Sequence, residues 1–277
     1  MFNIPNLFTA FNLLSGTMAI ILTLMGRIDL APFAIYLGAI FDFFDGFLAR
    51  KLKQSGELGK QLDSLADMVT FGLAPGLFMM VVIIVALNFG DVVAIKEFPS
   101  YVNYVLNDWK NAVFYGVPNQ MDTPLKFLPF IALFIPFMSM FRLAKFNIDT
   151  RQSESFIGLN TPANTIFFTV FPLVLNNEYN QSYHDNMLIY YVFQPALLLP
   201  IIGGMSLMLI SELPMFSLKF KHFKWKGNEI RFIFLISCGL LISFLLVWSI
   251  AIIVLLYMIL SLIENKFLNK IQNEVQS

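Results

Sequence analysis

Long apolar segments dominate this chain and restrict what it can fold into. A helix needs roughly 20 apolar residues to cross a hydrocarbon core about 30 Å thick. Runs suited to this role occur near 7–26, 29–48, 66–87, 126–144, 162–176 and 188–210, with boundaries that vary by a few residues. We therefore predict an all-α fold, a polytopic membrane helical bundle whose first six spans form one core.

The last apolar stretch, 230–263, is too long for a single simple span. As one helix it would measure roughly 50 Å, well beyond the hydrocarbon thickness. A C-terminal helical hairpin that breaks near Val247, Trp248 and Ser249 fits better than one strongly tilted helix. This prediction gives eight spans, with seven as the alternative.

Composition supports a membrane protein and excludes several other classes. Hydrophobic residues make up 57% of the chain and charged residues 13%, with mean hydropathy +0.71, outside the range of soluble domains. The 18 basic residues balance the 18 acidic ones, which gives no support for a nucleic-acid partner. Cys238 is the one cysteine, so neither a disulfide framework nor a cysteine-based metal site is expected.

Basic residues predict the orientation of the spans, because cytoplasmic connections carry an excess of Lys and Arg. Three connections are basic, and they contain Arg50, Lys51, Lys53 and Lys60, then Arg142, Lys145 and Arg151, then Lys219, Lys221, Lys224, Lys226 and Arg231. All three fall on one side of the bundle, which we predict to be cytoplasmic. His184 and His222 fall in loops on opposite sides, away from the acidic site, and are assigned no chemistry.

The connection 88–125 is long for such a bundle. Its apolar residues recur at roughly helical spacing: Tyr101, Val102, Tyr104, Val105, Trp109, Ala112 and Val113. We predict an amphipathic helix at the outer membrane interface, where Trp and Tyr are favoured. A lid over a substrate is the alternative.

Four carboxylates lie close together in the sequence at the edge of the second and third spans. Asp42 and Asp45 are three residues apart, and Asp63 and Asp67 are four apart, so each pair projects from one face of its helix. Unpaired acids at membrane depth are costly, and divalent cations such as Mg²⁺ or Mn²⁺ would remove that cost. Two such ions would form a clamp for displacement at phosphorus. The alternatives are a solvated loop of capping acids and an ion or proton pathway.

These residues resemble a known family. The segment from Asp42 to Asp67 fits the signature D-x2-D-G-x2-A-R-x8-G-x3-D-x3-D of the CDP-alcohol phosphatidyltransferases at every fixed position. Two further segments, DSLADMVTFGLAPG from Asp63 and FRLAKFN followed by FIGLNTPA from Phe141, are similar to the phosphatidylserine synthase branch. Asn160 departs from that branch, which often has proline there. The resemblance covers most of residues 1–210.

The resemblance implies transfer of a phosphatidyl group from CDP-diacylglycerol to L-serine, with release of CMP. Asp42, Asp45 and Asp63 would hold one ion, while Asp67 would help to hold a second and act as general base. Another alcohol acceptor, such as glycerol phosphate or inositol phosphate, or an archaeal ether-lipid donor, remains open. Family members are typically homodimers, and the expected location is a bacterial cytoplasmic membrane with the active site facing the cytoplasm.

The same resemblance implies a CDP-binding surface, with the candidates Gly46, Ala49, Arg50, Gly59, Asn6 and Thr9. Each of these candidates also has a simpler structural interpretation. The glycines could serve helix packing, Arg50 could be a membrane-side anchor, and Asn6 and Thr9 could cap the first helix.

Candidates for binding the acceptor or a lipid phosphate are Arg142, Lys145 and Asn147. The positive-inside rule explains the two basic residues equally well. The predicted organisation has four parts. Residues 1–210 form the catalytic membrane core with the 88–125 insertion, 211–231 a basic cytoplasmic loop that attracts lipid headgroups, 232–264 the hairpin, and 265–277 a cytoplasmic tail.

Overall fold

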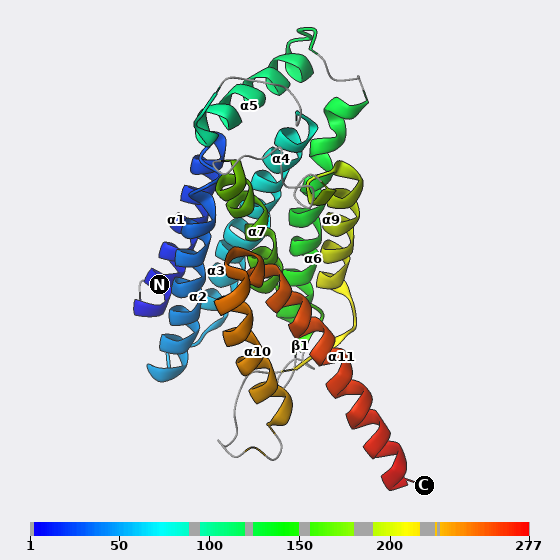
Figure 1. Cartoon of the computed structure of the whole chain (residues 1–277). Helices are drawn as coiled ribbons and strands as arrows, with labels where there is room; N and C mark the ends of the chain where they lie inside the picture. Colours follow the sequence, from blue (N-terminus) through cyan, green and yellow to red (C-terminus); the bar gives the residue numbers. More distant parts are fainter. Residues whose placement is uncertain are drawn as a thin grey trace.

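The computed structural model describes residues 3–88, 95–119, 124–149, 156–179, 191–216, 225 and 228–276. Its helices run side by side in one bundle, with a short helix across one end and a C-terminal hairpin on the flank (Figure 1). The predicted all-α membrane-type bundle is thus confirmed at the level of helical architecture. Arg151, Lys219, Lys221, Lys224, Lys226, His184 and His222 lie outside the described residues.

The first two helices, α1 (Ile4–Leu24) and α2 (Ala31–Lys51), pack against each other along their length. Each begins with a proline in its first turn, where a missing N–H costs no helical hydrogen bond. The cap of α1 is Asn3, whose side chain accepts a 2.9 Å hydrogen bond from the Asn6 backbone N–H. Asn3, and not Asn6 or Thr9, is therefore the cap of this helix, and the alternative that those two residues serve as caps is wrong.

A continuous helical rod follows, made of α3 (Glu57–Asp67), the π-helical turn η1 (Met68–Leu73) and α4 (Ala74–Leu87). Gly16 of α1 lies directly against this turn, since a Cβ there would be 2.3 Å from Thr70 Oγ1. Only glycine permits this approach, and it brings α1 against the rod immediately beyond Asp67.

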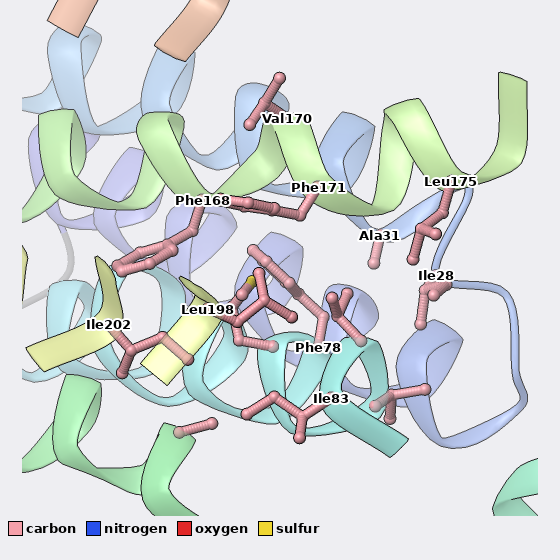
Figure 2. Packing of buried hydrophobic residues seen from close by; sticks show 14 of the residues in the cluster. Ile28, Ala31, Phe78, Ile83, Phe168, Val170, Phe171, Leu175, Leu198 and Ile202 are labelled. Carbon is pink, nitrogen blue, oxygen red and sulfur yellow. The ribbon is translucent and has the colours of Figure 1, made fainter. Parts of the chain in front are cut away.

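The last part of the rod, α4, lies in the centre of the bundle and is buried over most of its surface. Figure 2 shows Phe78 of α4 packed near Phe168 and Phe171 of α7 (Thr161–Tyr179) and near Leu198 of α9 (Pro195–Ile210). All four side chains are almost inaccessible. This apolar core fixes the rod whose first part carries two of the acids.

The remaining core elements are the 3-10 helix η2 (Leu125–Leu133) and α6 (Phe134–Ile148), which together form one apolar span. Two short strands, β1 (Phe156–Ile157) and β2 (Pro214–Met215), pair antiparallel with Phe156 opposite Met215. Lys60 Nζ donates to the Asn147 carbonyl at 2.6 Å, so the connections after α2 and α6 meet at one end of the bundle. β2 places the segment after α9 at the same end, as the distribution of basic residues predicts (Figure 1).

The predicted helix in the 88–125 connection is α5 (Phe98–Phe114), which lies across the end of the bundle opposite β1 (Figure 1). Its apolar side packs on the protein, with Tyr101, Val102, Val105 and Trp109 buried, while Tyr104 is exposed. Trp109 Nε1 donates to the Lys126 carbonyl at 2.8 Å. The expected amphipathic helix is therefore present, and its apolar face contacts the bundle, far from the acids; its place at a membrane interface stays a prediction.

The C-terminal hairpin consists of α10 (Glu229–Leu245), the 3-10 turn η4 (Leu246–Trp248) and α11 (Ser249–Gln276). Leu246 has φ +45° and ψ −117°, a non-helical backbone conformation that ends the first helix. The break predicted near Val247 is confirmed, one residue earlier. The two helices contact each other, and α11 also packs on α7.

By length and composition, five helices of the described chain could cross a membrane: Ile4–Leu24, Ala31–Lys51, Glu57–Leu87, Leu125–Ile148 and the combined stretch Glu229–Asn265. α7 occupies the predicted 162–176 run but is not among them, and α9 is a shorter apolar helix of 16 residues. The pattern is that of a polytopic membrane protein.

Candidate functional site

Three of the four predicted acids converge at one end of the bundle. Asp42 on α2 and Asp63 and Asp67 on α3 each place a carboxylate oxygen so that these atoms lie within 4.8 Å of one another. The spacing along each helix explains this, because residues three or four apart share a face. Asp67 is 9% exposed, so its carboxylate is largely withdrawn from water.

Helix α1 supplies hydrogen bonds that orient two of the carboxylates. Thr9 Oγ1 donates to Asp45 Oδ2 at 2.7 Å, and Asn12 Nδ2 donates to Asp67 Oδ1 at 3.0 Å. Asp45 is also buried, at 6% exposure, one turn along α2 from Asp42 but outside the three-oxygen group. The predicted set of four acids is thus split into a close group of three and a neighbour held by Thr9.

Asp63 Oδ1 is buried and has no hydrogen-bond partner among the described residues. A buried carboxylate oxygen next to two further carboxylates is unfavourable unless a cation compensates the charge. Oxygen donors of this kind suit Mg²⁺ or Mn²⁺. The residues present therefore fit a divalent cation, and the orphaned oxygen is the observation that makes the case.

A first cavity of about 270 Å³ opens beside the acids. All six predicted nucleotide-binding candidates line it, together with Asp45 and Asp63; the six are Asn6, Thr9, Gly46, Ala49, Arg50 and Gly59. Its remaining walls come from residues that the sequence pattern did not single out for this role: Pro5, Gln54, Ser55, Gly56 and Lys60. Residues from three separate segments thus meet around one space that ends at the acids.

A second cavity, of about 240 Å³, also borders the acidic group. Asp42, Asp63 and Asp67 form one wall, and Arg142 of α6 contributes a cation to the lining. The rest of the lining is Leu143, Phe146, Asn160, Thr161 and Pro162. Arg142 is only 3% exposed, its Nε donates to the Leu159 carbonyl at 3.2 Å, and its guanidinium carbon lies 5.3 Å from the Phe146 ring centroid.

Lys145 and Asn147, the other two acceptor candidates, are not among the residues that line these two cavities. Lys145 Nζ forms a 2.8 Å ion pair with Glu212 in the segment after α9. Asn147 Nδ2 donates to Ser64 Oγ at 2.8 Å, which connects α6 to α3. The structure brings Arg142 alone of the three to the acids, and an acceptor role for the other two stays a prediction.

Asn12 is the contact to the acids that the sequence interpretation missed. It lies in the middle of the first apolar run and is fully buried, with its amide on Asp67. Its own carbonyl accepts a 2.9 Å hydrogen bond from Thr70 in the π-helical turn. Asn6, Thr9 and Asn12 follow each other at three-residue intervals, a polar stripe within an apolar segment that could have revealed it.

Comparison with known proteins identifies what the chain is similar to. The sequence profile of the CDP-alcohol phosphatidyltransferase family matches residues 2–201, which include both cavities and all four acids. The match ends before β2 and the C-terminal hairpin.

The names of three individual relatives all refer to serine or to a serine lipid. A Bacillus subtilis protein named CDP-diacylglycerol--serine O-phosphatidyltransferase is 29% identical over 226 residues, which cover 82% of this chain and 94% of the relative. A Helicobacter pylori protein of the same name is 31% identical over 64% of this chain and 59% of the relative. An archaetidylserine synthase of Methanothermobacter thermautotrophicus is 26% identical over 61% of this chain and 58% of the relative.

Proposed function

The chain belongs to the CDP-alcohol phosphatidyltransferase family, and we propose that it transfers the phosphatidyl group of CDP-diacylglycerol to L-serine, giving phosphatidylserine and CMP. Serine as the acceptor is supported by the names of relatives that are 29% and 31% identical to this chain. The chemistry of the second cavity adds to that support.

One observation carries the proposal: Asp63 lines both cavities. A group transfer needs donor and acceptor to meet at a shared reacting atom. We assign the nucleotide of the donor to the first cavity, where Arg50, Lys60 and the glycines offer cations and close backbone approach. The acceptor alcohol then occupies the second cavity, and the pyrophosphate lies between them at the acids.

In the proposed reaction the serine hydroxyl oxygen attacks the phosphorus that carries the diacylglycerol. The new P–O bond to serine forms as the bond to the CMP oxygen breaks, and CMP leaves with that electron pair. Asp67 accepts the hydroxyl proton, and the hydrogen bond from Asn12 keeps its other oxygen oriented. Asp67 is suited to this role because it faces the second cavity, where the acceptor would sit.

Asp42, Asp45, Asp63 and Asp67 would hold two divalent cations, Mg²⁺ or Mn²⁺. Bound there, the ions would neutralise charge on the pyrophosphate and on departing CMP. Thr9 fixes the carboxylate of Asp45 toward the first cavity, so the donor side of the group is oriented before substrate binds.

Arg142 is the proposed partner of the serine carboxylate. It is buried, lines the second cavity and donates through Nε to the Leu159 carbonyl. A planar guanidinium there matches the geometry of a carboxylate better than any other cationic side chain. Lys145 and Asn147 would contribute to acceptor binding only indirectly, from outside the cavity. Lys145 pairs with Glu212, and Asn147 donates to Ser64.

We also propose how the chain is arranged in the membrane. We place eight spans, including α7, α9 and both hairpin helices, with the acidic end facing the cytoplasm because the basic connections gather there. Residues 1–210 then form the catalytic core, 211–231 a headgroup-binding loop, 232–264 the hairpin and 265–277 a tail. The proposed setting is a bacterial cytoplasmic membrane, with the chain as a homodimer.

The test is CMP release by the purified full chain with CDP-diacylglycerol and a panel of alcohols. We expect turnover with L-serine and little with glycerol 3-phosphate or inositol phosphate. Preference for another alcohol would refute the serine assignment, and preference for an ether-lipid donor would favour the activity named for the archaeal relative. Absence of CMP release with every alcohol would refute the enzyme and leave an ion pathway through the acids as the alternative.

A further inference from the structure

Helix α11 binds the backbone of Phe216, just beyond the segment that matches the family. The Tyr257 hydroxyl donates to the Phe216 carbonyl at 3.0 Å, and Ser261 Oγ accepts from the Phe216 N–H at 3.2 Å. The Phe216 ring also packs against Tyr257, with centroids 4.9 Å apart, and against Phe234 of α10. Both backbone groups of one residue are therefore fixed by side chains of the hairpin.

Phe216 directly follows β2, so this attachment continues into the strand pair. β2 pairs with β1, and the pairing extends beyond the strands because Gly158 N–H donates to the Leu213 carbonyl at 2.7 Å. Gly158 has φ +77°, and a Cβ there would lie 2.7 Å from the Ser211 carbonyl oxygen. A larger residue would be strained and would clash with backbone, so this close approach requires glycine.

The next residues after Gly158 reach the second cavity. Leu159 N–H donates to the Met208 carbonyl at 3.0 Å, and the Leu159 carbonyl accepts from Arg142 Nε. Asn160 follows, and its side chain caps α7 by accepting from the Ala163 N–H at 2.8 Å. Thus Arg142 and Asn160, which both line the second cavity, are held by a loop whose position depends on β2.

We propose that Tyr257 and Ser261 of the C-terminal hairpin are positioning residues for the acceptor cavity, acting through Phe216, the β1–β2 pair and Leu159 on Arg142. This inference rests on the proposed function for its assignment of the second cavity to the acceptor. It gives the hairpin, which lies outside the family match, a role in the affinity for one substrate.

The physical reason is that a two-residue strand pair has little stability of its own. β1 and β2 form too few backbone hydrogen bonds to fix their relative position, so a bond at each of the two backbone groups of Phe216 prevents β2 from sliding. Ser261 is 1% exposed, and a hydroxyl buried to this degree costs free energy unless it has a hydrogen-bond partner. Among the described residues, the lining of the first cavity comes only from positions 5–63 and includes none of this segment, so the donor side should be insensitive to it.

The test compares Ser261→Ala and Tyr257→Phe with Ser243→Ala in the purified full chain. Ser243 lies on α10 and, like Ser261, donates to a carbonyl one turn earlier in its own helix, but its hydroxyl is exposed. We expect each hairpin variant to raise the KM for serine about two- to tenfold, with the KM for CDP-diacylglycerol and kcat nearly unchanged. Ser261→Thr, which keeps the hydroxyl, and Ser243→Ala should both leave the KM for serine at the wild-type value.

A double-mutant cycle identifies the route. In an Arg142→Ala background, Ser261→Ala should add little to the serine KM, because both changes act on one cavity. Additive effects, equal rises in both KM values, or no change in either would overturn the proposal.

A second readout does not depend on turnover. In a Cys238→Ser background, thiol labelling at Asn160→Cys should become severalfold faster when Ser261→Ala loosens the loop, and should be unaffected by Ser243→Ala. Unchanged labelling would overturn the positioning role even if the enzyme is active. Faster labelling in a chain that releases no CMP would uphold the structural coupling while refuting the proposed function.

Discussion

The side-chain amide of Asn12 donates a 3.0 Å hydrogen bond to Asp67, which ties the first helix to the last acid of the cluster. Asn12 is fully buried and in turn accepts from Thr70 through its backbone carbonyl. Because both bonds cross to the helical rod at the π-helical turn, α1 fixes the orientation of the proposed base. A residue inside an otherwise apolar span therefore belongs to the site.

Replacing Asn12 tests that relationship. Asn12→Ala should lower kcat roughly tenfold or more with little effect on either KM, because a hydrogen bond to a charged group is worth about 1.5–3 kcal/mol. Steady-state CMP release measures this. The control is Ser15→Ala, one turn further along α1, whose hydroxyl bonds to Phe11 within its own helix. If Asn12→Ala behaves like Ser15→Ala, the contact has no part in the reaction.

Metal dependence follows from the three converging carboxylates. We expect activity to disappear in excess chelator and to return with Mg²⁺ or Mn²⁺, since those ions compensate the buried charge. Asp42→Asn and Asp63→Asn should abolish turnover while the protein still inserts and purifies normally. Full activity in chelator would contradict the metal assignment.

Arg142 should discriminate between the two substrates. If it binds the serine carboxylate, Arg142→Ala raises the KM for serine about ten- to a hundredfold, the cost of a charge-assisted hydrogen bond of about 1.5–3 kcal/mol, and changes that for CDP-diacylglycerol far less. Lys145→Ala is the comparison, and we expect a smaller rise in the KM for serine, because that lysine pairs with Glu212 and is not in the lining of either cavity. Equal loss for both substrates would instead assign Arg142 to the donor phosphates.

The orientation in the membrane is testable with single cysteines in a Cys238→Ser background. Ser55 lies at the acidic end and Tyr115 follows α5 at the opposite end, and both are exposed. We expect Ser55→Cys to react with a membrane-impermeant thiol reagent only from the cytoplasmic side and Tyr115→Cys only from the outside. Labelling of both from one side would refute the proposed topology.

Local sequence rules determined the helical membrane fold, the hairpin break and the face of each acid-bearing helix. Apolar run length sets the spans, and three- or four-residue spacing aligns Asp42 with Asp45 and Asp63 with Asp67. Those rules depend only on the geometry of one helix, so they could be applied without knowing the neighbours. The six residues proposed for the nucleotide came from the resemblance to a family and not from these rules.

Tertiary packing decided the rest. Close approach at Gly16 brought Asn12 to Asp67, the ion pair with Glu212 kept Lys145 away from the cavity that Arg142 lines, and α5 turned its apolar face onto the bundle. The link from Tyr257 and Ser261 to the loop of Leu159 and Asn160 joins residues about a hundred positions apart through two short strands that have no strong sequence signature. Such contacts depend on which helix surfaces meet, and that is settled by the summed packing of the whole bundle rather than by any one segment.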